Sequence, residues 1–335
     1  DARSSLVGSE MCIRDRDKII IFDMEGLRKF SDPQCMSFAE LLELGKAHGQ
    51  NHPQLWAQEV AAAEPEDLLI LTYTSGTTGN PKGAMISNRN MLFMMRNLQR
   101  MYGIFDTDEQ LGFLPTAHVA AQMFYNFGVI ESCSVINLVE ELETTDQDQQ
   151  EVAPTIAFAV PRVWEKKHSQ VTIKLKEGTA FGRWAFALAM KYARRVAEAK
   201  KHGAPAPPVA RVLTAVLDPL VFKNIRVMLG IDRCRWLSTG AAPIAPELID
   251  WFFALGCPMY EVYGQTECTG LATANLPGDM RVGSVGKPGE DIEVALSEQG
   301  EILIRSPGVI RGYWQNPEKT AETFRQGWLH TGDVG

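Results

Sequence analysis

The sequence predicts an α/β fold in which helices cover parallel-rich sheets, followed by a small β subdomain. From Lys18 onward, short apolar runs alternate with amphipathic helical patterns, which is typical of a largely parallel sheet covered on both faces. After about Gly278 the pattern changes to short strands separated by turns. Because 335 residues correspond to about two domains, we expect an α/β domain over residues 17–277 and a β-rich subdomain over residues 278–335.

Short apolar stretches bounded by polar or turn residues predict the strands. In the α/β part they are Lys18–Phe22, Leu68–Tyr73, Leu111–Leu114, Ser134–Leu138, Thr155–Val160, Cys234–Ser238 and Pro258–Val262. In the β-rich part they are Ser284–Lys287, Ile292–Leu296 and Glu301–Arg305.

Apolar residues at helical spacing predict the helices between these strands. The first covers Ser37–His48, and Ser87 starts the second. The apolar face of the second helix is made of Met91, Met94, Met95, Leu98 and Met101. Two long helices, Phe181–Lys200 and Val209–Leu229, flank the Pro-rich connection Lys201–Pro208.

The composition argues against several classes of protein. With 33 basic and 41 acidic residues the net charge is −8, so we expect no nucleic-acid partner. Six scattered cysteines without a Cys-x-x-Cys pair argue against a structural zinc or a disulfide framework and favour a cytoplasmic, reducing compartment. No apolar run is long enough to cross a bilayer. Asp1–Arg16 is charged, lacks the apolar core of a signal peptide, and is expected to be an extraneous segment.

The stretch Leu71–Gly83 is the clearest sign of a binding site. It reads LTYTSGTTGNPKG between a predicted strand and a predicted helix, where backbone N–H groups and the helix dipole favour anions. Glycines allow close approach of the backbone, hydroxyls donate hydrogen bonds, and a lysine adds positive charge, which together suit a polyphosphate. The residues concerned are Thr74, Ser75, Gly76, Thr77, Thr78, Gly79 and Lys82. Pro81 before the lysine and Gly83 after it exclude a Walker A loop, and a flexible surface turn is the alternative.

The string TSGTTGNPKG at residues 74–83 closely resembles the signature loop of the adenylate-forming (AMP-binding) superfamily. Tyr263–Glu267 (YGQTE) and Trp328–Asp333 (WLHTGD) match further motifs in the family's order. The resemblance covers nearly all of Lys18–Gly335 and implies the large N-terminal domain of an adenylate-forming enzyme.

Within this resemblance, the motif YGQTE, including Gly264, is expected to bind ATP. The ring of Tyr263 would stack on a base, and the hydroxyl of Thr266 would donate to the α-phosphate. A carboxylate repels phosphate unless a cation intervenes, so Glu267 implies a Mg²⁺ ion. Taken alone, Thr266 and Glu267 are better explained as the start of a helix, but beside the upstream loop the phosphate site is preferred.

The resemblance assigns other contacts as well. A wall of the adenine pocket is formed by Gly240, Ala241 and Ala242, the ribose diol binds Asp333, and the carboxylate of the substrate lies near His118. A plain strand-to-helix turn and a helix-capping histidine are the alternatives. The helix after the histidine is expected to carry Val119, Met123, Phe127 and Ile130 on one face. We expect His330 to be structural, and most of Gly300–Ile302 and Gly312–Trp314 to pack within the β subdomain.

A longer match narrows the family. Val160–Lys166, together with Leu114–Gln122 and Ser238–Pro243, resembles long-chain acyl-CoA synthetases, the bubblegum type in particular. Trp164 is expected to be a packing residue. The resemblance implies activation of a fatty acid by ATP and Mg²⁺ through an acyl-adenylate, and transfer to coenzyme A with release of AMP and pyrophosphate. Its catalytic residues, Lys82, Thr266 and Glu267, would act by neutralising charge.

Other functions stay open. One alternative is an acyl- or aryl-adenylating enzyme that passes its product to a carrier protein. The other is a nucleotide-binding fragment without turnover. The resemblance also implies a C-terminal domain that is absent from this sequence, so the fragment alone is expected not to be fully active. The charge and apolar pattern of the predicted helix Phe181–Lys200 fits either contact with a membrane surface or burial against the sheet. It places Arg194, Arg195, Lys200 and Lys201 opposite Trp184, Leu188 and Tyr192.

Overall fold

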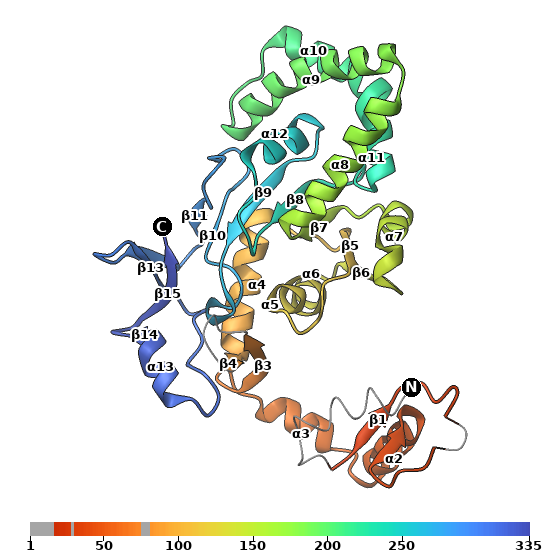
Figure 1. Cartoon of the computed structure of the whole chain (residues 1–335). Helices are drawn as coiled ribbons and strands as arrows, with labels where there is room; N and C mark the ends of the chain where they lie inside the picture. The colour runs from red at the N-terminus through yellow and green to blue at the C-terminus, as the bar shows by residue number, and fades with distance from the viewer. Residues whose placement is uncertain (1–16, 28–29, 75–80) are drawn as a thin grey trace. The chain divides into compact units, whose positions relative to one another are not determined.

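The computed structural model describes residues 17–27, 30–74 and 81–335 (Figure 1). The segment 1–16 and six residues of the predicted phosphate loop, Ser75–Asn80, lie outside the described residues. The chain divides into two compact units at Glu64 and Pro65, and each is described by itself.

Within its described residues, 17–27 and 30–64, the first unit has two short strands and two helices. β1 (Ile19–Ile21) pairs in parallel with β2 (Cys35–Ser37), and α2 (Phe38–Asn51) and α3 (Leu55–Ala62) follow. The last residue of β2 caps α2, because its hydroxyl accepts a hydrogen bond from the N–H of Glu40 while the Glu40 carboxylate accepts one from the N–H of Ser37. The predicted first strand and first helix are therefore confirmed.

The largest sheet of the second unit has the order β11-β10-β9-β8-β7. β7 (Ile156–Ala159), β8 (Trp236–Thr239) and β9 (Met259–Tyr263) are parallel, whereas β10 (Thr273–Ala274) and β11 (Lys287–Pro288) add antiparallel strands. All four residues of β8 are buried. Since successive side chains of a strand point to opposite faces, both faces of this sheet are covered, as the sequence predicts.

Two strand pairs and a central helix lie beside this sheet. β3 (Leu68–Thr74) pairs antiparallel with β4 (Lys82–Ser87), and β5 (Glu109–Gly112) pairs in parallel with β6 (Val135–Leu138). The central helix, α4 (Asn88–Tyr102), begins directly after β4 and buries the predicted methionine face. The shorter elements η2 (Leu142–Thr144) and α7 (Thr145–Val152) follow β6.

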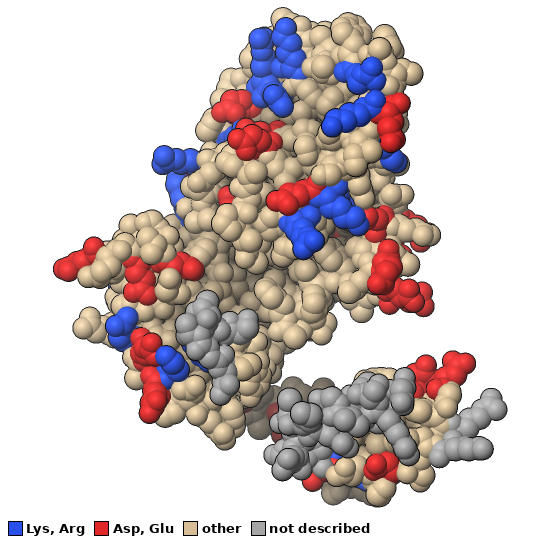
Figure 2. All heavy atoms as spheres, in the orientation of Figure 1, with Lys and Arg blue, Asp and Glu red and all other residues tan. Residues whose placement is uncertain are grey.

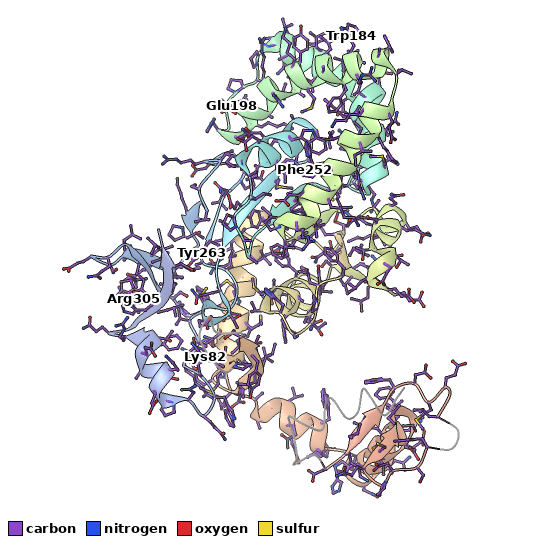
Figure 3. All side chains as sticks on the ribbon, viewed as in Figure 1. Lys82, Trp184, Glu198, Phe252, Tyr263 and Arg305 are labelled. Atoms are coloured by element: carbon purple, nitrogen blue, oxygen red, sulfur yellow. The ribbon has the colours of Figure 1, made fainter. Side chains whose placement is uncertain are left out.

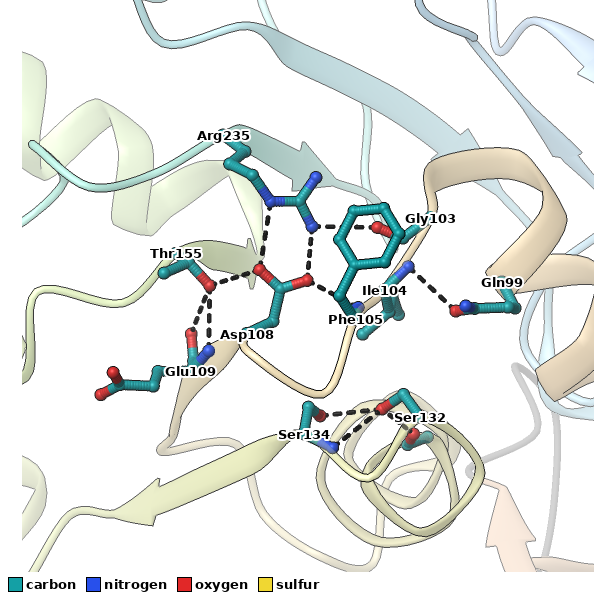
Figure 4. A network of polar contacts seen from close by, with 11 residues as sticks. Gln99, Gly103, Ile104, Phe105, Asp108, Glu109, Ser132, Ser134, Thr155 and Arg235 are labelled. Carbon is teal, nitrogen blue, oxygen red and sulfur yellow. Dashed lines mark hydrogen bonds and ion pairs between the residues drawn. The ribbon is translucent and has the colours of Figure 1, made fainter.

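An ion pair between the buried Asp108 and the partly exposed Arg235 connects the end of α4 to the strands (Figure 4). Both carboxylate oxygens of Asp108 accept hydrogen bonds from the guanidinium of Arg235. Asp108 also accepts from the Thr155 hydroxyl at 2.6 Å and from the Phe105 N–H at 2.8 Å, and Arg235 donates to the carbonyl of Gly103. Burial would by itself raise the pKa of Asp108, but these hydrogen bonds hold it below the usual value.

A layer of helices lies next to the large sheet. It consists of α8 (Pro161–Glu177), α9 (Ala180–Lys201), α10 (Pro208–Leu217) and α11 (Lys223–Leu229), and α12 (Pro246–Ala254) packs against α9. Trp164 is 1% exposed and donates its indole N–H to the carbonyl of Ala159, so it is the packing residue that the sequence predicts. The predicted helix Val209–Leu229 is helical over its whole length, but it is not α-helical throughout. A π-helical turn, η3 (Asp218–Phe222), interrupts it because Pro219 lacks the N–H of the α-helical pattern.

A second π-helical turn lies near the cavity described below. α5 (Val119–Ala121) continues into the π-helical η1 (Gln122–Phe127) and then α6 (Gly128–Ser132). Because a π turn contains more residues than an α turn, the apolar face rotates along this segment. Val119 and Met123 are buried as predicted, whereas Ile130 is 73% exposed and does not share their face.

The C-terminal sheet is small and antiparallel, with the order β12-β13-β15-β14. Its elements are β12 (Glu293–Leu296), β13 (Glu301–Arg305), α13 (Pro317–Thr323), β14 (Phe324–Arg325) and β15 (Trp328–Val334). The strand predicted at Ser284–Lys287 differs from the structure, because β11 starts at Lys287 and belongs to the large sheet. A Cβ on Gly286 would lie 2.0 Å from the Ala274 carbonyl, so only glycine allows this approach to β10.

The strand predicted at Leu111–Leu114 begins two residues earlier, at Glu109. Its pairing with β6 ends at Gly112, three residues before Pro115. No helix in the described part of the chain is both long and apolar enough to cross a bilayer.

Candidate active site

A cavity of about 590 Å³ lies in the second unit, between the strand ends and the small sheet. Its polar lining comes from β3, β4, the segment after β9, and the small sheet with its flanking residues. This part is formed by Thr74, Lys82, Gln265, Thr266, Glu267, Glu301, Tyr313, His330 and Thr331. Its apolar lining comes from α4, α5, η1, β7, β9 and the segment after η4. This part is formed by Leu98, Val119, Met123, Phe124, Phe158, Val262 and Leu271. The cavity therefore suits a ligand with an anionic part and an apolar part.

The two described ends of the predicted phosphate loop face each other across β3 and β4. Thr74 and Lys82 are register partners, and the Thr74 hydroxyl lies 3.5 Å from the Lys82 carbonyl. Both residues line the cavity, so the loop between them starts and ends at its wall. Figure 3 shows Lys82 beside this strand pair.

Glu267 lies in a short 3₁₀ turn, η4 (Thr266–Cys268), directly after β9. Thr266 is the first residue of this turn and Gln265 occupies the capping position, so the alternative of a helix capped by Thr266 is wrong. Glu267 is only 9% exposed, and its Oε1 accepts a hydrogen bond of 2.7 Å from the hydroxyl of Tyr313.

Tyr313 is a site residue that the sequence analysis missed. Its neighbours pair with β4: the Met85 N–H donates to the Gly312 carbonyl, and the Trp314 N–H donates to the Gly83 carbonyl. The expectation that this segment packs within the β subdomain is therefore wrong for Tyr313, which lines the cavity. Its position between two motifs that match the family indicated a site residue. Nothing in the sequence indicated that its hydroxyl would bond to Glu267.

The strand β15 places Asp333 next to β9. The Tyr263 hydroxyl donates a hydrogen bond of 2.7 Å to Oδ2 of Asp333. Burial, and beyond it the bond to this carboxylate, raise the pKa of the Tyr263 phenol. The predicted base-stacking residue and the predicted ribose ligand thus lie side by side, although 70 positions separate them in the sequence.

His330 and Glu301 form a pair beside Asp333 and line the cavity. The Nδ1 of His330 lies 2.9 Å from one carboxylate oxygen of Glu301, and the other oxygen accepts a hydrogen bond from the N–H of Gly332. The bond with His330 lowers the pKa of Glu301. The pair therefore has a structural role, because it holds the part of β15 that carries Asp333.

Close backbone packing explains two glycines of the motifs. A Cβ on Gly264 would lie 2.5 Å from the carbonyl oxygen of Gly270, and a Cβ on Gly240 would lie 2.8 Å from Val262. Ala241 lines the cavity, whereas Gly240 and Ala242 are absent from its lining. Gly240 therefore positions the loop rather than contacting this cavity.

His118 lies at the start of α5, on the cavity wall. Its Nδ1 accepts a hydrogen bond of 3.0 Å from the N–H of Ala120, so the capping role that the sequence left open is present. Burial lowers the pKa of His118, which favours a neutral ring with its hydrogen on Nε2. A neutral donor at this place can contact a carboxylate of a ligand.

The residues present fit a Mg²⁺ ion bound together with a phosphate ligand. Glu267 supplies a nearly buried carboxylate, and the described residues contain no cluster of three or more His, Cys, Asp or Glu that could hold a metal alone. Mg²⁺ commonly takes one or two carboxylates and completes its shell with substrate phosphates and water. Glu267 is therefore a suitable single protein ligand.

The model of the AMP-binding enzyme family matches residues 13–314. The chain belongs to this family. Among its relatives, the Mycobacterium tuberculosis protein fadD11, named as a fatty-acid–CoA ligase, is 36% identical over 310 residues, which cover 92% of this chain and 54% of that protein. Long-chain-fatty-acid–CoA ligase 1 of Cavia porcellus is 32% identical over 323 residues, covering 89% of this chain and 45% of the relative. The chain thus spans about half the length of the curated relatives it matches.

Solved structures show the same fold. O-succinylbenzoate coenzyme A synthetase from Bacillus subtilis, in complex with ATP and magnesium ion, superposes with a TM-score of 0.56 at 20% identity. The match covers 82% of this chain and 48% of that one. The sheet with covering helices and the small β-sheet are therefore those of the large domain of adenylate-forming enzymes.

Proposed function

We propose that the protein is a long-chain fatty acid–CoA ligase that forms an acyl-adenylate from ATP and then acyl-CoA, AMP and pyrophosphate. The observation that carries this proposal is one cavity in which Lys82, Thr266 and Glu267 lie opposite an apolar lining. Membership of the AMP-binding family and the names of its relatives support the reaction class. The apolar lining supports an aliphatic acid as the substrate.

In the first step, an oxygen of the fatty acid carboxylate attacks the α-phosphorus of ATP. The bond from that phosphorus to the bridging oxygen breaks, and pyrophosphate leaves with the electron pair. Both reactants are anions, so the contribution of the protein is to position them and to reduce their repulsion. In the proposed arrangement Lys82 neutralises the pyrophosphate and the hydroxyl of Thr266 donates to the α-phosphate.

Other residues of the site hold the remaining parts of the substrates. Nε2 of His118 donates to the carboxylate of the acid, and Asp333, held by Tyr263, accepts from the ribose hydroxyls. The apolar lining binds the acyl chain. Mg²⁺ held by Glu267 would supply additional charge stabilisation on the phosphates.

In the second step, the sulfur of coenzyme A forms a bond to the acyl carbon and its thiol proton passes to solvent. The bond from that carbon to the phosphate oxygen breaks, and AMP leaves with the electron pair. Coenzyme A is therefore proposed as the second substrate. We also retain the prediction of a cytoplasmic location.

The experiment is thermal stabilisation of the chain by non-reactive acyl-sulfamoyl adenosines of increasing acyl length. A ligand that binds only the folded state at 100 times its dissociation constant adds about 2.7 kcal/mol to the free energy of unfolding. Stabilisation that rises from short to long acyl groups is expected, with the non-acylated sulfamate as control. Preference for short or aromatic acyl groups would overturn the long-chain assignment, and no stabilisation by any compound would overturn the adenylate site.

A further inference from the structure

The helical layer of the second unit is strongly basic. Residues 161–229 contain fourteen Lys and Arg but only four Asp and Glu, a net charge of +10 in a chain whose net charge is −8. Figure 2 shows Lys and Arg gathered over the upper part of the molecule, where α9 and α10 lie in Figure 1. The net charge of the whole chain is therefore negative although the surface of this layer is positive.

Some of these cations are neutralised by neighbours and others are not. Arg226 pairs with Asp218, and Lys201 pairs with Glu198 and Asp250. Lys191 and Lys223 are exposed and, in the described part of the chain, have no carboxylate within ion-pair distance. These side chains are available to an anionic partner.

An apolar stripe runs along the outer side of the same layer. Val209, Val212, Val216 and Leu220 recur every three or four residues along α10 and the following π turn. Their exposed fractions are 67%, 59%, 57% and 69%. Since residues at this spacing share one face of a helix, they form a continuous exposed surface, which we call the α10 stripe.

Two exposed aromatic residues lie on α9, the helix that packs against α10 and the following π turn. Phe181 and Trp184 are 74% and 60% exposed, with ring centroids 5.7 Å apart. Phe186 of α9 contacts Phe222, which brings this end of α9 next to the end of the α10 stripe. Figure 3 shows Trp184 at the outer edge of the helical layer, away from the sheet.

The basic face of α9 continues from these aromatic residues. Lys191 and Arg195 follow Trp184 at helical spacing and are exposed, whereas the small residues on the other side, such as Ala189 and Ala193, are buried. Ordinary burial is therefore right for the alanine face and wrong for Trp184. The expectation that Arg195 lies opposite Trp184 is also wrong, because a spacing of eleven residues returns to the same face of a helix.

We propose that this α9–α10 face binds the surface of a bilayer that contains anionic phospholipids. Exposed aliphatic and tryptophan side chains enter the headgroup region, and adjacent Lys and Arg contact lipid phosphates. The combination of positive charge with an apolar stripe favours an anionic lipid surface over nucleic acid, because a nucleic-acid backbone offers nothing for exposed aliphatic side chains to contact. The inference does not depend on the proposed ligase function, because binding is measured without acid, ATP or coenzyme A.

The test is co-sedimentation of the chain with phosphatidylcholine vesicles and with vesicles that contain about 30% phosphatidylglycerol. Binding is expected with the anionic vesicles, and it should weaken at high salt, about 0.5 M, where surface charges are screened. A triple variant, Val212→Ser/Val216→Ser/Leu220→Ser, and a charge variant, Lys191→Glu/Arg195→Glu, should each lower the partition coefficient about tenfold or more.

Matched variants on other surfaces are the controls. Ile130→Ser/Leu138→Ser removes apolar residues that are 73% and 71% exposed, and Arg96→Glu/Arg281→Glu reverses exposed charges. Both should bind as the unchanged chain does. All variants must show the thermal transition of the parent, so that loss of binding does not reflect unfolding.

A second readout is quenching of tryptophan fluorescence by brominated lipid, part of which should disappear in Trp184→Phe. No binding to anionic vesicles, or binding unaffected by both surface variants, would overturn the proposal. A chain that sediments as a dimer and becomes a monomer in the triple variant, without vesicle binding, would show that the stripe is covered by a second copy instead.

Discussion

The hydroxyl of Tyr313 donates a 2.7 Å hydrogen bond to Glu267, and Nζ of Lys82 lies 5.1 Å from the centroid of the same ring. The residues on either side of Tyr313 pair with β4, the strand that Lys82 begins. Tyr313 therefore connects the lysine of the phosphate loop to the carboxylate proposed to hold Mg²⁺.

Replacing this tyrosine should weaken the metal dependence of nucleotide binding. Tyr313→Phe keeps the ring under Lys82 but leaves Oε1 of Glu267 without its donor, at a cost of about 1–2 kcal/mol in the free energy of unfolding. We expect a higher Mg²⁺ concentration for half-maximal stabilisation by ATP in thermal melts. Equal Mg²⁺ dependence in both proteins would show that the hydroxyl does not position Glu267.

The carboxylate itself should govern how Mg²⁺ and ATP act together. In Glu267→Gln, the added stabilisation that Mg²⁺ gives to the ATP complex should disappear, because the amide is a much weaker ligand for a hard cation. Binding of ATP without metal should be unchanged or stronger, because one negative charge has been removed. Isothermal titration with and without Mg²⁺ distinguishes this from general damage to the site, which would weaken both.

Asp333 should act on the nucleoside and not on the phosphates. Asp333→Asn can still accept the hydrogen bond from Tyr263, but it loses a charged acceptor for the ribose hydroxyls, which is worth about 1.5–3 kcal/mol. The affinity for AMP should therefore fall about tenfold or more, while stabilisation by pyrophosphate stays the same. A parallel loss for both ligands would contradict the assignment to ribose.

The Asp108–Arg235 pair should be important for stability. Asp108→Asn weakens the two hydrogen bonds from Arg235, whose side chain is 38% exposed and can be hydrated, so we expect a loss of about 1–2 kcal/mol in the free energy of unfolding. The matched control is Asp279→Asn, whose partner Lys287 is exposed, and its effect should stay below about 1 kcal/mol.

The same pair predicts a pH dependence. The pKa of Asp108 is lower in the folded chain than in the unfolded one, where it is about 3.9, so the unfolded chain binds more protons between the two values. The stabilisation is complete above about pH 4 and is lost as the pH falls through the folded-state pKa. Asp108→Asn should show a smaller loss of stability in that acidic range, and an identical pH profile would contradict the prediction.

A methyl group at Gly264 should disrupt the turn before Glu267. The Cβ of Gly264→Ala would meet the Gly270 carbonyl oxygen at 2.5 Å, so we expect destabilisation by about 3 kcal/mol. The control is Gly45→Ala in α2, where no atom lies within 4 Å and the helix should gain about 0.5–1 kcal/mol. Chemical denaturation of both variants measures the difference, and a neutral Gly264→Ala would contradict the packing argument.

The sequence by itself determined the features of the fold that depend on residues close together in the chain. The serine caps of α2 and α4, the buried face of α4, the parallel strands β7, β8 and β9, and the family motifs are all local patterns of spacing and residue type. The predictions made from these patterns are correct because capping and amphipathic burial act within a few residues of the chain. The family resemblance then predicted that these motifs share a site, without giving the geometry of that site.

The tertiary structure alone decided which distant side chains meet. Tyr313 reaches Glu267 over 46 positions, and Asp108 reaches Arg235 over 127. The π turn at η1 also turned Ile130 out to solvent, where helical spacing had placed it on the buried face. Such contacts depend on register and packing between separate elements, and a side chain's type does not specify its partner at that distance. The same holds for α9–α10, where the spacing marked an apolar face but only packing showed that part of it remains exposed.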